Sequence, residues 1–328
     1  VTHPLLAEAV TQFQAQAFKE LLPADGPVRT QVVGAESKET IQQANRVRDY
    51  MNYQITDVME EYTPEMDQML FFLPLAGSTF KKVYYDPAAQ RCKATFIHAE
   101  DLVVPYNASD LYEAERISEV QRVTKNTVAK RIASGFYRDV DLPEPFFNED
   151  RAQKKYQELE GVTPQKYQDL YNFVEMHVDL DLPGYESDDG VKVPYIVTLD
   201  RDSMTIMSIY RNYKPDDDSR KRIPYFVHYK FLPGLGFYGF GLIHMIGGLS
   251  KAATGALRQL LDAGTLANLP AGFKSRGLRV RDDAEPLQPG EFRDIDAPGG
   301  NIRDQFQLLP FKEPSQTLFS LLGFCVDA

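Results

Sequence analysis

The sequence predicts an α+β fold in which one large mixed body is followed by a long helix that carries a small β-rich module. Helical periodicity dominates residues 5–74, and β-like apolar runs dominate residues 172–232. The composition changes at Pro233, after which residues 241–264 are strongly helical in pattern and residues 268–310 are rich in proline and glycine. Helices and strands that occupy separate stretches of a chain are typical of α+β proteins.

The first 74 residues are expected to form three helices. Residues 5–22 and 37–62 carry apolar side chains at spacings of three and four, so each helix should bury one face. Thr63-Pro64-Glu65 predicts the start of the third helix, with Thr63 as the N-cap, and that helix should end near Pro74. The expected buried face of the second helix consists of Val47, Met51, Ile55, Val58 and Tyr62.

The middle of the chain is expected to be mainly β structure. Residues 78–86 and 93–100 are rich in Thr, Phe, Val and Tyr, and the turn residues between them predict a hairpin. We expect short helices at about 109–117, 124–134 and 149–171. Four β-like runs follow, at 172–180, 191–199, 203–212 and 222–232. The simplest arrangement is an antiparallel meander of all four, packed on the preceding helices.

Composition and charge restrict the possible functions. The 328 residues include 43% hydrophobic residues, which is enough to form a substantial core. A net charge of −11 argues against a protein that grips nucleic acid by its phosphates, although a passage through which DNA slides requires weak electrostatics. Cys92 and Cys325 are too far apart in sequence to suggest a disulfide framework or a zinc site.

The ends of the sequence suggest a piece of a longer protein. The chain begins at Val1, without a basic and apolar leader, and stops at Ala328 within an apolar segment. We therefore expect a fragment cut at both ends. No apolar stretch approaches the roughly 20 residues that a membrane-spanning helix needs, so no membrane association is expected.

The segment Gly234-Leu235-Gly236-Phe237-Tyr238-Gly239 matches the GxGxxG pattern of dinucleotide-binding turns. Pro233 interrupts the turn, and Asp262, the acid at about the required distance, lies within the next predicted helix. The preceding run contains His228 and Lys230, which a parallel strand buried on both faces would not carry. The sequence therefore favours a flexible hinge into the long helix over a cofactor site.

No catalytic or metal-binding set is indicated. Glu175, His177 and Asp179 alternate onto one face of a predicted strand and resemble a metal-ligand set, but alternating polar residues are common on half-exposed strands. The motifs GxSxG, HExxH and GxxxxGK[ST] are absent. We therefore expect no enzyme activity, no catalytic residue, no cofactor and no metal.

The helix at 241–264 contains small residues that would allow neighbouring helices to approach closely, as in a crowded bundle or ring. His244, Lys251 and Arg258 recur every seven residues and form a polar stripe. This stripe could be an ordinary solvated face, or it could face a channel. Opposite it lies an apolar stripe of Leu242, Leu249, Ala253, Leu257 and Leu260.

The module at 268–311 contains both signs of charge in similar strength. Complementary edges of this kind favour head-to-tail contact between identical subunits, which closes a ring when the rotation permits. Contact with nucleic acid and a solvated surface are the alternatives. The basic residues are Lys274, Arg276, Arg279, Arg281 and Arg293, and the acidic ones are Asp282, Asp283, Glu285, Glu291, Asp294 and Asp296.

Several long segments resemble the portal (head-to-tail connector) proteins of tailed bacteriophages, in particular those of podophages similar to the Salmonella phage P-twenty-two. The resemblance covers most of the chain and is densest from residue 247 to residue 315. Its segments are 52–58, 67–70, 73–86, 100–106, 247–260, 268–272, 289–293 and 309–315.

The resemblance implies a portal fold with an α/β wing, a long stem helix and a small β-rich clip, whose C-terminal part is missing. By segment, residues 1–235 resemble the wing, 236–267 the first stem helix, 268–311 the clip and 312–328 the truncated start of a second stem helix. The clip residues Lys274, Arg276, Arg279, Arg281, Glu291, Arg293 and Asp294 are then candidates for contacts with other subunits, terminase or adaptors, and His244, Lys251 and Arg258 are candidates for a channel-facing stripe.

The implied function is structural. Portal subunits form a ring, a dodecamer in this family, at one vertex of the virion capsid, and the ring assembles in the host cytoplasm. Double-stranded DNA passes through it during packaging and ejection. The implied partners are the terminase large subunit, a tail adaptor or head-completion protein, and the major capsid and scaffolding proteins. The alternatives are another virion structural protein and a nucleotide-binding enzyme that uses residues 234–239.

Overall fold

The computed structural model describes residues 1–86, 89–145, 170–185, 190–268, 272–274, 279–280, 295–296, 306–308 and 313–327. The chain divides into two compact units. The larger unit is Ala9–Ile243, and the smaller one combines Val1–Glu8 with His244–Ala328. The protein is a mixed α+β fold with antiparallel sheets, as the sequence predicts. None of the helices in the described ranges is both long and apolar enough to cross a membrane.

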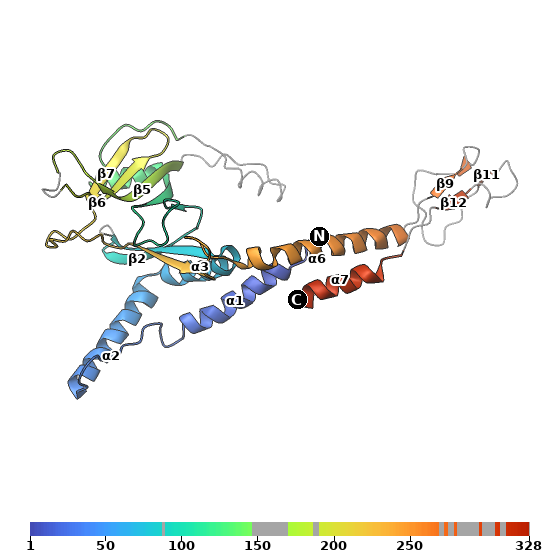
Figure 1. Ribbon diagram of the computed structural model, residues 1–328, viewed down its shortest axis with the longest axis horizontal. Helices are drawn as coiled ribbons and strands as arrows, with labels where there is room; N and C mark the ends of the chain where they lie inside the picture. Colours follow the sequence, from blue (N-terminus) through green and yellow to red (C-terminus); the bar gives the residue numbers. More distant parts are fainter. Residues whose placement is uncertain are drawn as a thin grey trace. The chain divides into compact units, whose positions relative to one another are not determined.

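The three expected N-terminal helices are present (Figure 1). Helix α1 is Leu5–Leu21, and α2 is Lys38–Tyr53, which continues as the π-helical turn η1 at Gln54–Val58. A reciprocal capping box between Ser37 and Thr40 fixes the start of α2. The predicted buried face of this helix holds only in part. Val47 and Met51 are exposed and α2 has no buried residue, whereas Ile55, Val58 and Tyr62, which follow α2, are half-buried.

Helix α3, Tyr62–Ala76, differs from prediction at both ends. It begins one residue before Thr63, and its N-cap position is Glu61, so Thr63 is not the cap. It continues through Pro74 and ends at Gly77, whose φ of 88° is left-handed. Pro74 lies in the last turn of the helix without ending it. The helix stops at Gly77, because glycine adopts the αL conformation at little cost.

The first sheet has the strand order β2-β1-β8. Strands β1 (Ser78–Asp86) and β2 (Arg91–Ile97) form the expected hairpin. Strand β8 (Phe226–Lys230) pairs with β1, with Ser78 opposite Lys230, so the prediction that it extends the meander is wrong. Alternation of side chains identifies a strand but does not specify its neighbour. Here burial of Phe226 against Phe80 in a shared core cluster places the strand.

The second sheet has the order β3-β4-β5-β6-β7. Its strands are Leu102–Val103, Arg116–Thr124, Leu170–Leu180, Val193–Asp200 and Ile206–Arg211. The antiparallel meander of β5, β6 and β7 is confirmed.

Two of the short helices expected before this meander need correction. The helix expected at 109–117 is absent, because this stretch is a turn that runs into β4, whose Ile117 and Val123 are buried. The helix expected at 124–134 is α4, Lys125–Ala133, capped by the Thr124 side chain. The helix expected at 149–171 lies outside the described residues up to 169, and β5 has begun at Leu170.

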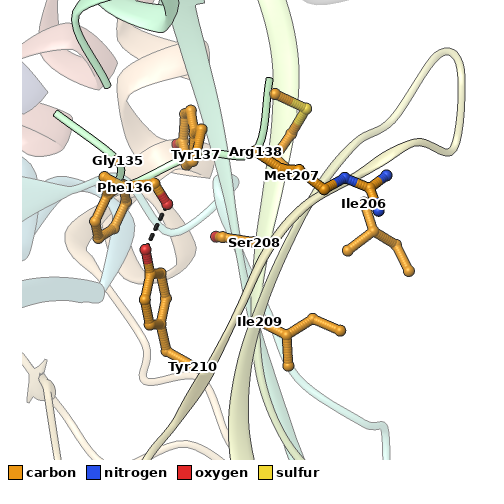
Figure 2. A pocket seen from close by; sticks show the side chains of 9 residues that line it. All are labelled: Gly135, Phe136, Tyr137, Arg138, Ile206, Met207, Ser208, Ile209 and Tyr210. Carbon is orange, nitrogen blue, oxygen red and sulfur yellow. Dashed lines mark hydrogen bonds between the residues drawn. The ribbon is translucent and has the colours of Figure 1, made fainter. Parts of the chain in front are cut away.

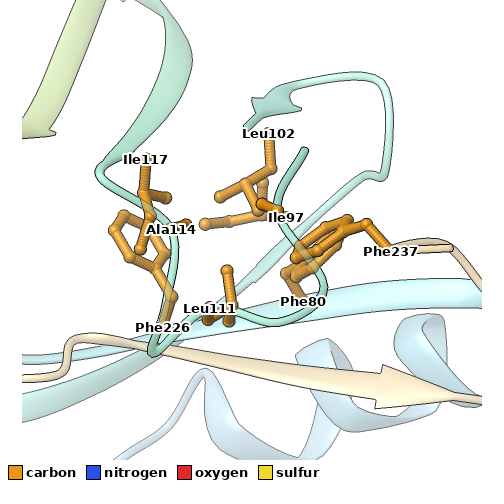
Figure 3. Close-up of a cluster of buried hydrophobic side chains, with 9 residues drawn as sticks. Phe80, Ile97, Leu102, Leu111, Ala114, Ile117, Phe226 and Phe237 are labelled. Carbon is orange, nitrogen blue, oxygen red and sulfur yellow. The ribbon is translucent and has the colours of Figure 1, made fainter. Parts of the chain in front are cut away.

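The main core lies between the two sheets (Figure 3). Phe80 from β1 and Phe226 from β8 meet Leu102 from β3 and Ile117 from β4. The opposite face of the first sheet is covered by α3, where Met69 and other buried residues form a separate cluster. The first five residues of β1, Ser78–Lys82, are therefore buried on both faces of the first sheet, whereas Val83 and Tyr85 farther along the strand are exposed.

The smaller unit consists of two helices joined by short paired strands. Helix α6, Leu242–Asn268, is 27 residues long, and α7 is Gln316–Asp327, so the expected long helix and second helix are both present. Between them, β9 (Gly272–Lys274) pairs with β12 (Phe306–Leu308), and β10 (Arg279–Val280) pairs with β11 (Ile295–Asp296). At the N-terminus of the chain, the backbone N–H of His3 donates to Thr254 Oγ1 over 3.1 Å.

Candidate functional site

The polar stripe of α6 lies on an exposed face of the helix. His244, Lys251 and Arg258 are all exposed, whereas Ala253 and Ala256 are buried. Arg258 is partly engaged within the chain, because its Nε donates to the carbonyl oxygen of Val1 over 2.8 Å. The seven-residue spacing therefore gives one exposed polar edge, whereas Ala253 and Ala256 are the buried residues of the helix.

The module between α6 and α7 brings two candidate residues into short sheets. Backbone pairing places Arg279 opposite Asp296 and Lys274 opposite Phe306. Residues of opposite charge thus occupy directly facing positions of the β10–β11 pair. The remaining candidates, Arg276, Arg281, Glu291, Arg293 and Asp294, lie outside the described residues.

The glycine-rich segment 234–239 is a compact loop whose surroundings do not match a dinucleotide-binding turn. The strand before it, β8, is antiparallel to β1, whereas a dinucleotide-binding unit requires parallel strands. Phe237, at the centre of the loop, is buried and stacks on Phe80 at a centroid distance of 5.8 Å. The backbone N–H of Phe240 donates to Leu232 O over 3.0 Å and closes the loop. These contacts fix the loop and argue against a freely flexible hinge.

Glycine is required here by close backbone packing. A Cβ atom on Gly241 would lie 2.4 Å from Leu75 O, and one on Gly77 would lie 2.4 Å from Gly241 N. A Cβ atom on Gly234 would lie 2.0 Å from Tyr238 O. Gly77 and Gly241 therefore let the entry to α6 lie directly against the end of α3. Close backbone packing also accounts for Gly234 and Gly239 of the GxGxxG motif without a ligand, but not for Gly236, where a Cβ atom would meet nothing within 4 Å.

The residues that resembled a metal-ligand set are engaged in other contacts. His177 Nε2 lies 2.9 Å from Glu175 Oε1. Asp179 Oδ2 forms an ion pair with Arg222 at 2.9 Å. Within the described ranges no three His, Cys, Asp or Glu side chains are placed to hold a metal ion. The alternation of Glu175 and His177 instead reflects a buried polar network.

This network joins the two sheets of the larger unit. Lys82 Nζ, from β1, lies 2.6 Å from Glu119 Oε2 on β4 and 2.6 Å from Glu175 Oε1 on β5. Gln121 Nε2 donates to both carboxylates, over 3.0 Å and 3.2 Å. His177, 1% exposed, completes the cluster. An ammonium group held by two carboxylates, which themselves accept further hydrogen bonds, is a compensated arrangement for buried charge.

Electrostatics within the network keep Lys82 and Glu175 ionised. Burial by itself would raise the pKa of Glu175, but the hydrogen bond from His177 and the charge of Lys82 outweigh burial and lower this pKa to about 2. Burial would lower the pKa of Lys82, but the two glutamates reverse that effect and raise it. The charges thus stabilise one another, and the network holds the two sheets at a fixed separation.

The neighbouring lysine has a different environment. Lys81 Nζ is buried without a hydrogen-bond partner among the described residues and lies 4.4 Å from the centroid of the Tyr62 ring. Burial lowers the pKa of Lys81 to about 8, although Glu65 acts in the opposite direction. Contact with the aromatic face compensates part of the cost of burying this charge.

Sequence reasoning missed the network of Lys82, Glu119 and Glu175. Its members are 37 and 93 residues from Lys82, and no local pattern connects them. The available signal was charged residues within otherwise β-like runs, which predicts an unusual environment but not the partner. Comparison with models of known protein families and with curated proteins gave no match for the chain.

Proposed function

We propose that this chain is a structural subunit of a portal ring, which forms a channel for double-stranded DNA and a docking surface for packaging and tail proteins. The proposal rests on the sequence resemblance to portal proteins. The observation that best supports it is the smaller unit, in which a 27-residue helix, a set of short paired strands and a second helix follow one another. This is the order of stem, clip and stem that the resemblance implies.

The character of α6 suits a helix placed among copies of itself. Ala253 and Ala256 are buried, and no Cβ atom added to Gly248 or Gly255 would meet another atom within 4 Å. A helix with such small side chains presents a narrow surface, against which another helix can pack at short range. The exposed His244, Lys251 and Arg258 would then form the edge available to the channel.

Weak electrostatics suit the passage of DNA. Each phosphate that a protein neutralises adds affinity, which a sliding duplex would have to overcome at every step. The chain has a net charge of −11, and its stem stripe presents three basic or titratable side chains, seven residues apart, along one helix. Such spacing permits transient contacts without a continuous basic groove.

The module between the helices supports a role in subunit contact. Backbone pairing places Arg279 opposite Asp296 in the β10–β11 pair, so residues of both signs occupy neighbouring positions of the module. Surfaces that carry both signs can pair head to tail with an identical copy, and such heterologous contacts close into a ring.

The test uses charge reversal in the intact protein. The double variant Arg276→Glu/Arg279→Glu should reduce the fraction of protein in rings at least tenfold in analytical ultracentrifugation, because it replaces attraction between opposite charges by repulsion. A tenfold change in an association constant corresponds to about 1.4 kcal/mol. Adding Glu291→Lys and Asp294→Lys should restore the rings. Unchanged assembly and normal DNA packaging by the double variant would remove the charged module from the proposal.

A further inference from the structure

The outer edge of β7 carries backbone groups that no described residue satisfies. Asn212 N donates to Pro194 O over 2.9 Å, so the hydrogen-bonded pairs between β6 and β7 fall on the even-numbered residues of β7. Alternation then directs the N–H and C=O groups of Ile209 and Arg211 away from β6. The carbonyl of Met207 confirms this direction, because it accepts a hydrogen bond from Arg138 N outside the sheet.

The segment beside β7 covers only the start of its edge. Arg138 provides the one backbone hydrogen bond to it that is found among the described residues. Phe136 then turns away, held by a hydrogen bond from the Tyr210 hydroxyl to its carbonyl oxygen and by ring stacking at 5.2 Å (Figure 2). Between this segment and the strand lies a cavity of about 340 Å³, lined by residues 135–138 and 206–210.

Side chains around the open edge are apolar and basic. Ile209 and Tyr210 are 43% and 38% exposed, and Phe136 is 40% exposed. Arg211 is exposed and has no ion-pair partner among the described residues, although the chain as a whole carries a charge of −11. Uncovered backbone groups favour the addition of a strand. Ile209 and Arg211 lie on the same face of β7, so they favour an apolar residue opposite Ile209 and an acidic residue opposite Arg211.

We propose that the outer edge of β7 binds an extended peptide strand of a partner protein, in which apolar and acidic residues alternate along one face, that is, at every second position. The bound strand pairs with Ile209 and Arg211, places a carboxylate against the Arg211 guanidinium and packs apolar side chains against Ile209 and the Phe136–Tyr210 pair. Strand addition of this kind also removes the aggregation hazard of an exposed edge. It stands independently of the proposed ring function, because every group involved lies in the larger unit.

The experiment measures fluorescence anisotropy of a labelled ten-residue peptide, titrated with the whole protein. The peptide carries valine and glutamate in turn at every second position, with threonine between them, so that one face presents both residue types. Saturable binding is expected. A peptide with lysine in place of each glutamate should bind at least tenfold more weakly, because Arg211 repels lysine. Ile209→Pro should weaken binding at least tenfold. This variant removes an outward N–H and obstructs the incoming strand but leaves the hydrogen bonds between β6 and β7 intact.

Two controls separate lost binding from lost folding. Ile209→Ala keeps the outward N–H and should weaken binding by only about twofold to fivefold. Circular dichroism should show unchanged β content for Ile209→Pro. Equal binding by wild type and Ile209→Pro, or no saturable binding by a folded wild type, would overturn the assignment. Self-association of the wild type that Ile209→Pro abolishes would also overturn it, by giving the edge to a second copy of the chain.

Discussion

Lys81 and Lys82 are adjacent on β1, and their side chains meet opposite electrostatic environments on the two faces of the first sheet. Lys82 Nζ lies 2.6 Å from each of two carboxylates on the second sheet, whereas Lys81 Nζ lies over the Tyr62 ring without a hydrogen-bond partner among the described residues. One lysine joins two sheets and the other does not. This difference gives a direct test of what holds the larger unit together.

Replacing Lys82 should destabilise the protein strongly. Lys82→Met leaves Glu119 and Glu175 buried without their cation, so the free energy of unfolding should fall by about 3–5 kcal/mol. Lys81→Met removes both a buried unpaired charge and its aromatic contact, and these effects should cancel to within about 1 kcal/mol. Urea denaturation of both variants measures the difference. Equal losses would contradict the role given to the network.

The network should also contribute to stability at low pH. The pKa of Glu175 is lowered from 4.5 to about 2 in the folded protein, so between these values the unfolded state binds more protons. Stability should therefore decrease as the pH falls from 4.5 to about 2. The Glu175→Gln variant should lack this part of the pH dependence. A wild-type unfolding free energy that is flat over this range would contradict the coupling.

His228 should act over a separate, higher range. Burial, with a smaller effect from Lys230, lowers the pKa of His228 from 6.5 to about 4, and the ring is stacked on Phe80 at 4.4 Å. Protons bind the unfolded state first, so stability should decrease as the pH falls from 6.5 to about 4. NMR titration should give a pKa of about 4 for this ring. A normal titration near 6.5 would show that the ring is solvated.

Close backbone packing should make one glycine far less replaceable than another. Gly241→Ala places a Cβ atom 2.4 Å from Leu75 O and should lower the free energy of unfolding by about 1–3 kcal/mol. Gly248→Ala meets no atom within 4 Å and lies inside α6, so it should raise stability by about 0.5–1 kcal/mol. Thermal unfolding of both variants provides the comparison, and similar effects from both would contradict the packing argument.

Local patterns were sufficient to predict much of the secondary structure. Helix α6, helix α4 and the β5–β7 meander follow from periodicity, because each depends on residues close in sequence. The pairing of β8 with β1 could not be predicted, since a strand's alternation is the same beside any neighbour. The exposed apolar side of α2 shows the converse limit. An amphipathic pattern indicates a face suited to burial, but not what buries it.

The candidate site was less accessible from sequence. Spacing alone identified the exposed stripe of His244, Lys251 and Arg258. The pairing of Arg279 with Asp296 depends on the register between β10 and β11, and the Lys82 network depends on the packing of two sheets against each other. Both are tertiary relationships between residues far apart in the chain, and sequence patterns describe only near neighbours.

The portal proposal is tested most directly by imaging the purified protein. Negative-stain electron micrographs should show closed rings with a central channel, and native mass spectrometry should give a single mass close to twelve subunits. A persistently monomeric species that forms no ring, alone or in capsids, would contradict the proposal.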